Sequence, residues 1–123
     1  MIQTGKVDLK FALNDFVSDK DLAKAGVKYD QGKNRLGLVL SGFANALQEV
    51  GEIGTAGAIK YSDNGWLEVE NAYERYLDAM FRHLFKHLSG ETNDPDSGQR
   101  HLAHMCWNAL AIVELTSKEP IDE

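Results

Sequence analysis

From Leu36 onward, apolar residues recur at steps of three and four along the chain. This spacing puts them on one face of an α-helix, because a helix has about 3.6 residues per turn. Prolines, which break helices, occur only at positions 95 and 120. The chain is therefore predicted to be an all-α domain of long helices packed on one another. The first apolar run comprises Leu36, Val39, Leu40, Phe43, Leu47 and Val50.

Glycines set the predicted limits of the first two helices. The first helix starts at Leu36 and is expected to end or bend at Gly54 and Gly57, because glycine is a poor residue for a helix interior. The second helix is predicted from about Val69 to Leu88. Gly90 follows it in the place of a C′ glycine, which closes many helices.

A third helix is predicted after the loop that begins at Glu91. Asp94 and Pro95 are suited to be its N-cap and first helical residue, although Gly98 could delay its start. The helix is expected to reach about Thr116, and residues 117–123 are expected to form a frayed tail.

The first 27 residues are ambiguous. The apolar residues of 7–13 alternate with other residues, as in a short strand, whereas Asp19 to Ala25 suit one or two helical turns. The predicted organisation is an N-terminal arm of uncertain structure over 1–27 and a helical domain over 28–116, followed by the tail.

Length, composition and charge narrow the class of protein to which the chain can belong. A chain of 123 residues with 43% apolar and 26% charged residues is typical of one folded domain. The net charge of −6 argues against a nucleic-acid partner, and no apolar run is long enough for a membrane helix. Cys106 is the only cysteine, which excludes an internal disulfide and suits a cytoplasmic protein. An acidic protein can still bind a small polyphosphate if a divalent metal ion bridges the protein and the phosphates.

Two glutamates stand out in the first predicted helix. Glu49 and Glu52 are the only charged side chains between Leu36 and Ile59, and their spacing puts both on one side of the helix. One interpretation is a solvated acidic face. The other is a shielded pair that needs a cation, because close carboxylates repel each other. Oxygen ligands of this kind suit Mg²⁺ or Mn²⁺.

The second predicted helix carries another acidic pair, Glu74 and Asp78, followed by Arg82 and Lys86 at the same four-residue spacing. This pattern is common in surface ion-pair ladders. It also suits metal binding if the helix runs antiparallel to the one with Glu49, because the carboxylates would then converge.

Histidines form a third candidate group. His101 and His104 lie one turn apart on the last predicted helix, and His83 lies on the second. Imidazole binds transition metals well, but these side chains are equally suited to orient other groups through hydrogen bonds.

Basic and aromatic residues provide candidates for holding a nucleotide. Lys33 and Arg35 lie close to Gly32, just before a helix begins, and a helix N-terminus with basic side chains attracts phosphate. Lys60 and Tyr61 add a cation and a ring near Trp66. Aromatic rings can stack on a base, although such residues are more often core.

Several of these motifs, taken in order, resemble one family. They are Lys28-Tyr-Asp-Gln-Gly-Lys-Asn-Arg-Leu36, Gly57-Ala-Ile-Lys-Tyr61 before Trp66, Tyr76-Leu-Asp-Ala79 with Arg82-His-Leu84, Gly90-Glu91, Asp94-Pro-Asp-Ser-Gly98, and His101-Leu-Ala-His104 with Trp107-Asn-Ala109. Their order and spacing resemble the phage dATP/dGTP diphosphohydrolases, also called MazZ, which are MazG-like pyrophosphohydrolases.

The resemblance implies a MazG-like helical bundle that acts as a homodimer or homotetramer. It also implies metal-dependent cleavage of dGTP or dATP to the monophosphate and pyrophosphate, in the cytoplasm of the host if the chain is phage-encoded. In phages that replace adenine with 2-aminoadenine, such an enzyme would supply dGMP and deplete dATP.

The family binds Mg²⁺ or Mn²⁺ through Glu-x-x-Glu on one helix and Glu-x-x-Asp on the next. Glu49 and Glu52 match the first motif, and Asp78 matches the end of the second. The position three before Asp78 is Arg75, and Glu74 is one residue out of register. The ligand set implied is Glu49, Glu52 and Asp78, with Glu74 as a fourth candidate.

The predicted mechanism has the carboxylates hold two or more ions that present the triphosphate to an attacking water. Candidate substrate-binding residues are Lys33, Arg35, Lys60, Tyr61, Trp66, Arg82 and His83. Two alternatives stay open. One is a metal phosphohydrolase whose ligands are His83, His101 and His104, and the other is a nucleotide-binding helical module without catalysis.

Overall fold

The structure is a computed structural model that describes residues 26–117. The strand predicted within 7–13, its helical alternative and the tail beyond Ser117 lie outside the described residues. The described chain is helical and has no sheet, which confirms the all-α prediction. Its elements are α3 (Leu36–Gly42), α4 (Ala44–Lys60), a short 3₁₀ helix (Gly65–Glu68), α5 (Ala72–Leu88) and α6 (His101–Ser117).

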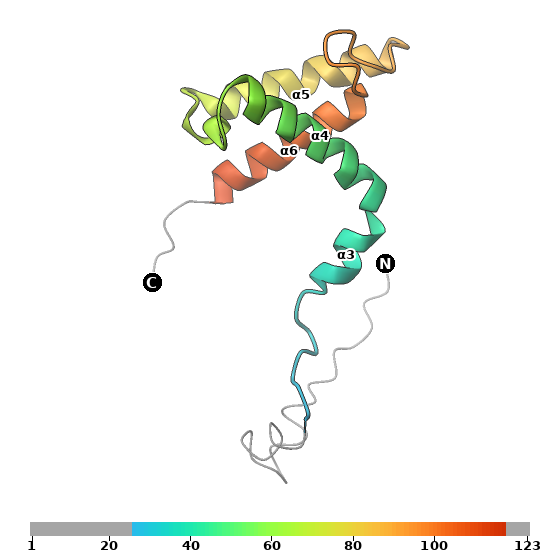
Figure 1. Cartoon of the computed structure of the whole chain (residues 1–123), viewed down its shortest axis with the longest axis vertical. Helices are drawn as coiled ribbons and strands as arrows, with labels where there is room; N and C mark the ends of the chain where they lie inside the picture. The colour runs from blue at the N-terminus through green and yellow to red at the C-terminus, as the bar shows by residue number, and fades with distance from the viewer. Residues whose placement is uncertain (1–25, 118–123) are drawn as a thin grey trace. The chain divides into compact units, whose positions relative to one another are not determined.

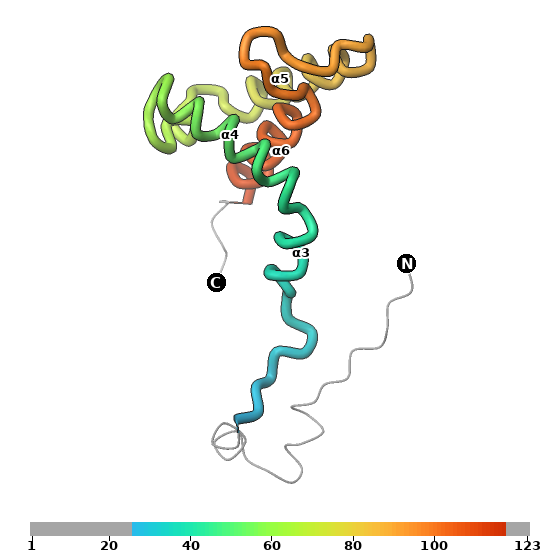
Figure 2. The backbone as a smooth tube through the Cα atoms, turned by 45° about the vertical axis from the view of Figure 1, so that its right-hand side comes forward, coloured from blue at the N-terminus to red at the C-terminus, as the bar shows by residue number. Residues whose placement is uncertain are grey.

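The chain divides into two units, Met1–Val39 and Leu40–Glu123. The described part of the first unit contains a turn, in which the Lys33 N–H donates to the Asp30 carbonyl at 3.0 Å, and the start of α3. The second unit contains α4, α5 and α6, and α6 packs against both of the others (Figure 1). The tube in Figure 2 follows the same three helices.

The first predicted helix is interrupted at Phe43, whose backbone leaves the helical region with φ −108° and ψ 27°. The prediction of one unbroken helix was therefore wrong at this point. The break follows Ser41 and Gly42, and Gly/Ser pairs are a common cause of helix kinks.

An end of this helix at Gly54 or Gly57 was also wrong, because α4 continues to Lys60, and a bend at these glycines stays a prediction. A Cβ atom at Gly54 would lie 3.3 Å from Nε1 of Trp107 in α6. Tertiary packing outweighs the low helix propensity of glycine here, since the missing side chain lets the two helices approach closely.

Helix α5 ends where the sequence predicts. Gly90 has φ 101°, its N–H donates to the His87 carbonyl, and the Glu91 N–H donates to the Lys86 carbonyl. This is the Schellman arrangement, which confirms Gly90 as the C′ residue. The start differs from the prediction, because the 3₁₀ helix and Asn71 in the left-handed region (φ 54°) delay it from Val69 to Ala72.

Helix α6 begins at His101, so the prediction of Asp94 as its N-cap was wrong. Asp94 instead closes a loop on itself: its Oδ1 accepts the Asp96 N–H at 3.0 Å and its carbonyl accepts the Gly98 N–H at 2.7 Å. An isolated antiparallel bridge between Asn93 and Arg100 brings the two ends of the loop together. Loop 91–100 is therefore a folded connection held by its own hydrogen bonds.

The core of the described chain is small. Its buried residues are Val50 of α4 and, on α6, Ala103, Ala111, His101 and Asn108. The predicted apolar face from Leu36 to Leu47 is not buried, and the exposed fractions of its members range from 38% to 63%. Only the Val50 end of that face was predicted correctly. None of the helices in the described range is both long enough and apolar enough to span a membrane.

Candidate functional site

A cleft of about 1500 Å³ lies in the second unit between the end of α4, the 3₁₀ helix, α5 and the start of α6. Five of the predicted site residues line it: Lys60, Tyr61, Trp66, Asp78 and Arg82. Lys60 and Tyr61 lie at the end of α4 and Trp66 in the 3₁₀ helix, and the packing of α5 adds Asp78 and Arg82.

The α5 wall of the cleft carries alternating charges. Arg75, Asp78 and Arg82 are spaced by three and four residues, which puts all three on the side of α5 that lines the cleft. Lys60, the last residue of α4, adds a third cation. Besides Asp78, the cleft is lined by Asp63, Asp94 and Asp96. Its cations and carboxylates together suit an anionic ligand that carries its own divalent cation.

The aromatic residues of the cleft divide into a packed group and an open ring. Trp66, Tyr76 and Trp107 meet edge to face with centroids 5.5–6.5 Å apart, and the Tyr76 hydroxyl donates to the Trp66 carbonyl at 2.8 Å. Burial raises the pKa of Tyr76. Tyr61 is 76% exposed, with Lys60 Nζ 5.2 Å from its ring centre. Trp66 is therefore held in the packing, whereas Tyr61 is open for stacking.

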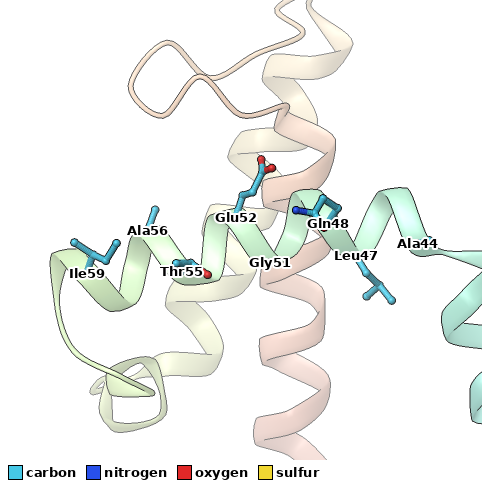
Figure 3. A pocket seen from close by; sticks show the side chains of 8 residues that line it. All are labelled: Ala44, Leu47, Gln48, Gly51, Glu52, Thr55, Ala56 and Ile59. Atoms are coloured by element: carbon cyan, nitrogen blue, oxygen red, sulfur yellow. The ribbon is translucent and has the colours of Figure 1, made fainter.

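Glu49 and Glu52 do not line the cleft but contact the loop that borders it. Both carboxylate oxygens of Glu49 accept hydrogen bonds of 2.7 Å from the Arg100 guanidinium. Gln99, which does line the cleft, donates from Nε2 to Glu52 at 3.1 Å. Glu52 also borders a separate pocket of about 640 Å³ along α4, and Figure 3 shows its side chain pointing toward the loop.

The ion pair with Arg100 bears on whether this place suits a metal. The hydrogen bonds from Arg100 lower the pKa of Glu49 and keep its carboxylate ionised. Both glutamates offer only oxygen atoms, which is the donor chemistry that Mg²⁺ and Mn²⁺ prefer. The donor atoms of the two α4 carboxylates are therefore of the type that binds a hard cation.

The histidines also come together, at the other end of α5. His83 stacks on His104 with ring centres 4.4 Å apart, and its Nδ1 lies 2.9 Å from Nδ1 of His101. Nε2 of His104 lies 2.7 Å from the Ser97 hydroxyl and 3.5 Å from Oδ2 of Asp94. His101 is 3% exposed, and its Nε2 lies 3.4 Å from Oε2 of Glu91 without the alignment of a hydrogen bond.

Burial lowers the pKa of both His83 and His104. For His83, the neighbouring His104 and His101 add to this effect, because a second positive charge nearby is unfavourable. For His104, the Asp94 carboxylate acts in the opposite direction. Desolvation therefore favours neutral imidazoles in this group.

The remaining predicted site residues do not line the cleft. Glu74 is exposed on α5. His83 stacks on His104, which does line the cleft. Lys33 and Arg35 belong to the first unit. The roles of these residues stay predictions.

Sequence reasoning missed Arg75, Arg100 and Asp94. Arg75 lies one turn before Asp78, so helical spacing alone indicates that it shares the same face. Arg100 is 51 residues from Glu49 in sequence, and no local pattern indicates that they pair. Asp94 was assigned to a helix cap, and only the fold of the loop places it beside His104.

The family model described as dATP/dGTP diphosphohydrolase, N-terminal, matches residues 23–123. A dATP/dGTP diphosphohydrolase of Salmonella phage PMBT28 is 31% identical over 98 residues, which are 80% of this chain. The aligned part is 32% of that relative, so the chain spans about a third of its length. No solved structure matches the chain.

Proposed function

Because the chain belongs to the family of dATP/dGTP diphosphohydrolase N-terminal domains, we propose that it hydrolyses purine deoxynucleoside triphosphates. The proposed substrates are dGTP and dATP, and the proposed products are the nucleoside monophosphate and pyrophosphate. The relative from the Salmonella phage is named for the same two nucleotides.

The observation that supports this proposal best is the composition of the large cleft. It combines three cationic side chains, four aspartates and an open aromatic ring. A triphosphate needs the cations, a catalytic cation needs carboxylate ligands, and a purine base can stack on the ring. Its volume of about 1500 Å³ is ample for a nucleotide.

Each cleft residue then has a role that its chemistry suits. Arg75 and Arg82 hold phosphate oxygens, because guanidinium groups bind phosphate through paired N–H donors. Lys60 offers a point charge at the opposite wall. Tyr61 stacks on the purine, while Trp66 supports the wall through its contacts with Tyr76 and Trp107. Lys33, Arg35 and His83 are further candidates for substrate contact.

Glu49, Glu52 and Asp78, with Glu74 as a fourth candidate, are proposed to hold Mg²⁺ or Mn²⁺. When bound, such an ion offsets phosphate charge and lowers the pKa of a coordinated water. The chain itself positions the two α4 carboxylates through Arg100 and Gln99. Because both partners belong to loop 91–100, this loop controls how the carboxylates are presented beside the cleft.

The proposal extends to assembly and setting. We propose a homodimer or homotetramer, since the apolar face of α4 around Phe43 and Leu47 is open in the single chain. The proposed setting is nucleotide-pool control in a phage-infected cell, within the host cytoplasm and linked to 2-aminoadenine synthesis.

The direct test is pyrophosphate release from the four dNTPs and four NTPs, with and without Mg²⁺ or Mn²⁺. We expect release from dGTP or dATP only with metal, and loss of release in Asp78→Asn and Glu49→Gln. Glu114→Gln, which removes an exposed carboxylate of α6, serves as the matched control. Nucleotide binding without release from any of the eight would favour a non-catalytic binding module instead.

A further inference from the structure

Three side chains outside the proposed carboxylate set converge at the junction of α5, loop 91–100 and α6. They are His83 of α5, Asp94 of the loop and His104 of α6, and all three are half-buried. One potential ligand atom of each lies within 4.8 Å of those of the other two.

The distances suit ligands of one ion. Two ligands about 2.0–2.1 Å from a tetrahedral ion are about 3.3–3.4 Å apart. Nε2 of His104 and Oδ2 of Asp94 are 3.5 Å apart, so they already approach this spacing. The exposed Ser97 hydroxyl lies 2.7 Å from the same His104 nitrogen and accepts the Gln99 N–H at 3.1 Å, so an ion at His104 would displace it.

Hydrogen bonding behind His83 prepares its other nitrogen for a metal. The buried His101 has Nε2 beside the Glu91 carboxylate, which favours a proton on that nitrogen. In the tautomer with that proton, Nδ1 of His101 is the acceptor and Nδ1–H of His83 the donor of their 2.9 Å contact. This assignment leaves the lone pair of His83 on Nε2. A ligating histidine with its second nitrogen oriented in this way is typical of metal sites.

We propose that His83, Asp94 and His104 bind one divalent transition-metal ion, with His101 and Glu91 as positioning residues for His83. Two imidazoles and a carboxylate suit Zn²⁺, Co²⁺ or Mn²⁺, whereas Mg²⁺ prefers oxygen ligands only. Three protein ligands leave a coordination position for water.

The site would join three elements that otherwise meet through few buried side chains. Loop 91–100 also carries Gln99 and Arg100, the partners of Glu52 and Glu49. An ion at Asp94 therefore fixes the same loop that holds the α4 carboxylates. The site itself does not depend on the proposed nucleotide chemistry.

The test is a titration of the metal-free chain of 123 residues with Co²⁺, followed by its visible absorption bands. We expect saturation at one ion per chain and loss of the bands in Asp94→Asn and His104→Gln. His101→Asn should weaken binding about 10- to 100-fold, because it removes the orienting partner of His83. His87→Gln, on the same helix as His83, should bind as the wild type does.

A second measurement needs no variant and so does not depend on correct folding of one. In ¹⁵N-edited NMR, one equivalent of Zn²⁺ should shift the ring signals of His83 and His104 and leave those of His87 unchanged. Equal shifts of all histidines, or unchanged Co²⁺ binding in both Asp94→Asn and His104→Gln, would overturn the site. Binding that survives Glu49→Gln but not Asp94→Asn separates this site from the carboxylate set.

Discussion

Arg100 and Glu49 form the closest ion pair in the described part of the chain. Two parallel hydrogen bonds of 2.7 Å make it bidentate, which is the strong arrangement for a guanidinium and a carboxylate. The pair ties loop 91–100 to α4 and sets the charge state of a proposed metal ligand.

Removing this guanidinium should change the pH dependence of stability. Because the folded-state pKa of Glu49 lies below its ordinary value of 4.5, the pair stabilises the fold above that pH and loses its effect as the pH falls through the folded pKa. We expect Arg100→Gln to flatten the acid side of the stability curve, measured by urea unfolding at several pH values.

The control for this prediction is Lys86→Gln, which removes the longer 3.9 Å pair with Glu91. Exposed pairs of this length contribute little, so its curve should follow the wild type. An unchanged acid slope in Arg100→Gln would contradict the prediction.

Arg82 and Lys86 test the two interpretations of the charged ladder on α5. Arg82 lines the cleft, whereas Lys86 lies outside it and pairs with Glu91. If Arg82 holds a phosphate, Arg82→Ala should lower kcat/KM for dGTP by about 100-fold or more, since a preorganised charge at the reacting group is worth this much. Lys86→Ala should leave kcat/KM within a few-fold of the wild type. Similar effects of both changes would favour a simple surface ladder.

At the scale of elements, α4 remains helical through Gly51, Gly54 and Gly57. Of these three glycines, only Gly54 would bring an added Cβ within 4 Å of another element, at 3.3 Å from Nε1 of Trp107. Gly51 has no atom within 4 Å of an added Cβ. The two glycines are chemically identical, and only the neighbouring helix distinguishes them.

The packing of α4 on α6 predicts opposite outcomes for two equal substitutions. Gly54→Leu should lower the free energy of unfolding by about 1–3 kcal/mol, because the new side chain overpacks the contact with Trp107. Gly51→Leu should be neutral or stabilising, since leucine favours the helix more than glycine does. Chemical denaturation of both variants checks this, and equal losses would contradict it.

At the scale of the whole molecule, the described chain leaves much apolar surface open. Phe43 and Leu47 are 59% and 38% exposed, and on α6 Leu110 and Val113 are 50% and 63% exposed. Few side chains are buried in return. Exposed apolar surface of this extent is typical of chains that associate.

Sedimentation analysis should therefore find a homodimer or homotetramer. Phe43→Glu and Leu47→Glu should shift the population toward monomers, because a charge on the α4 face must be desolvated on association. Thr116→Glu adds the same charge at an exposed polar position and serves as control. A wild-type chain that stays monomeric at high concentration would contradict the prediction.

Local chemistry was enough to predict the helical class, the end of α5 at its Schellman glycine and the end of α6 within one residue of Thr116. These features depend on residues three or four positions apart, so they can be predicted from the sequence alone. The ordered motifs also indicated the family, which the comparisons confirm.

Tertiary structure decided the features that join distant parts of the chain. The close approach of Trp107 to Gly54 joins α4 to α6, and the late start of α6 follows the folded loop around Asp94. The Glu49–Arg100 pair and the His83–Asp94–His104 group each join separate elements. Such contacts arise from the docking of α6 on its neighbours, and no local spacing encodes the distance between helices.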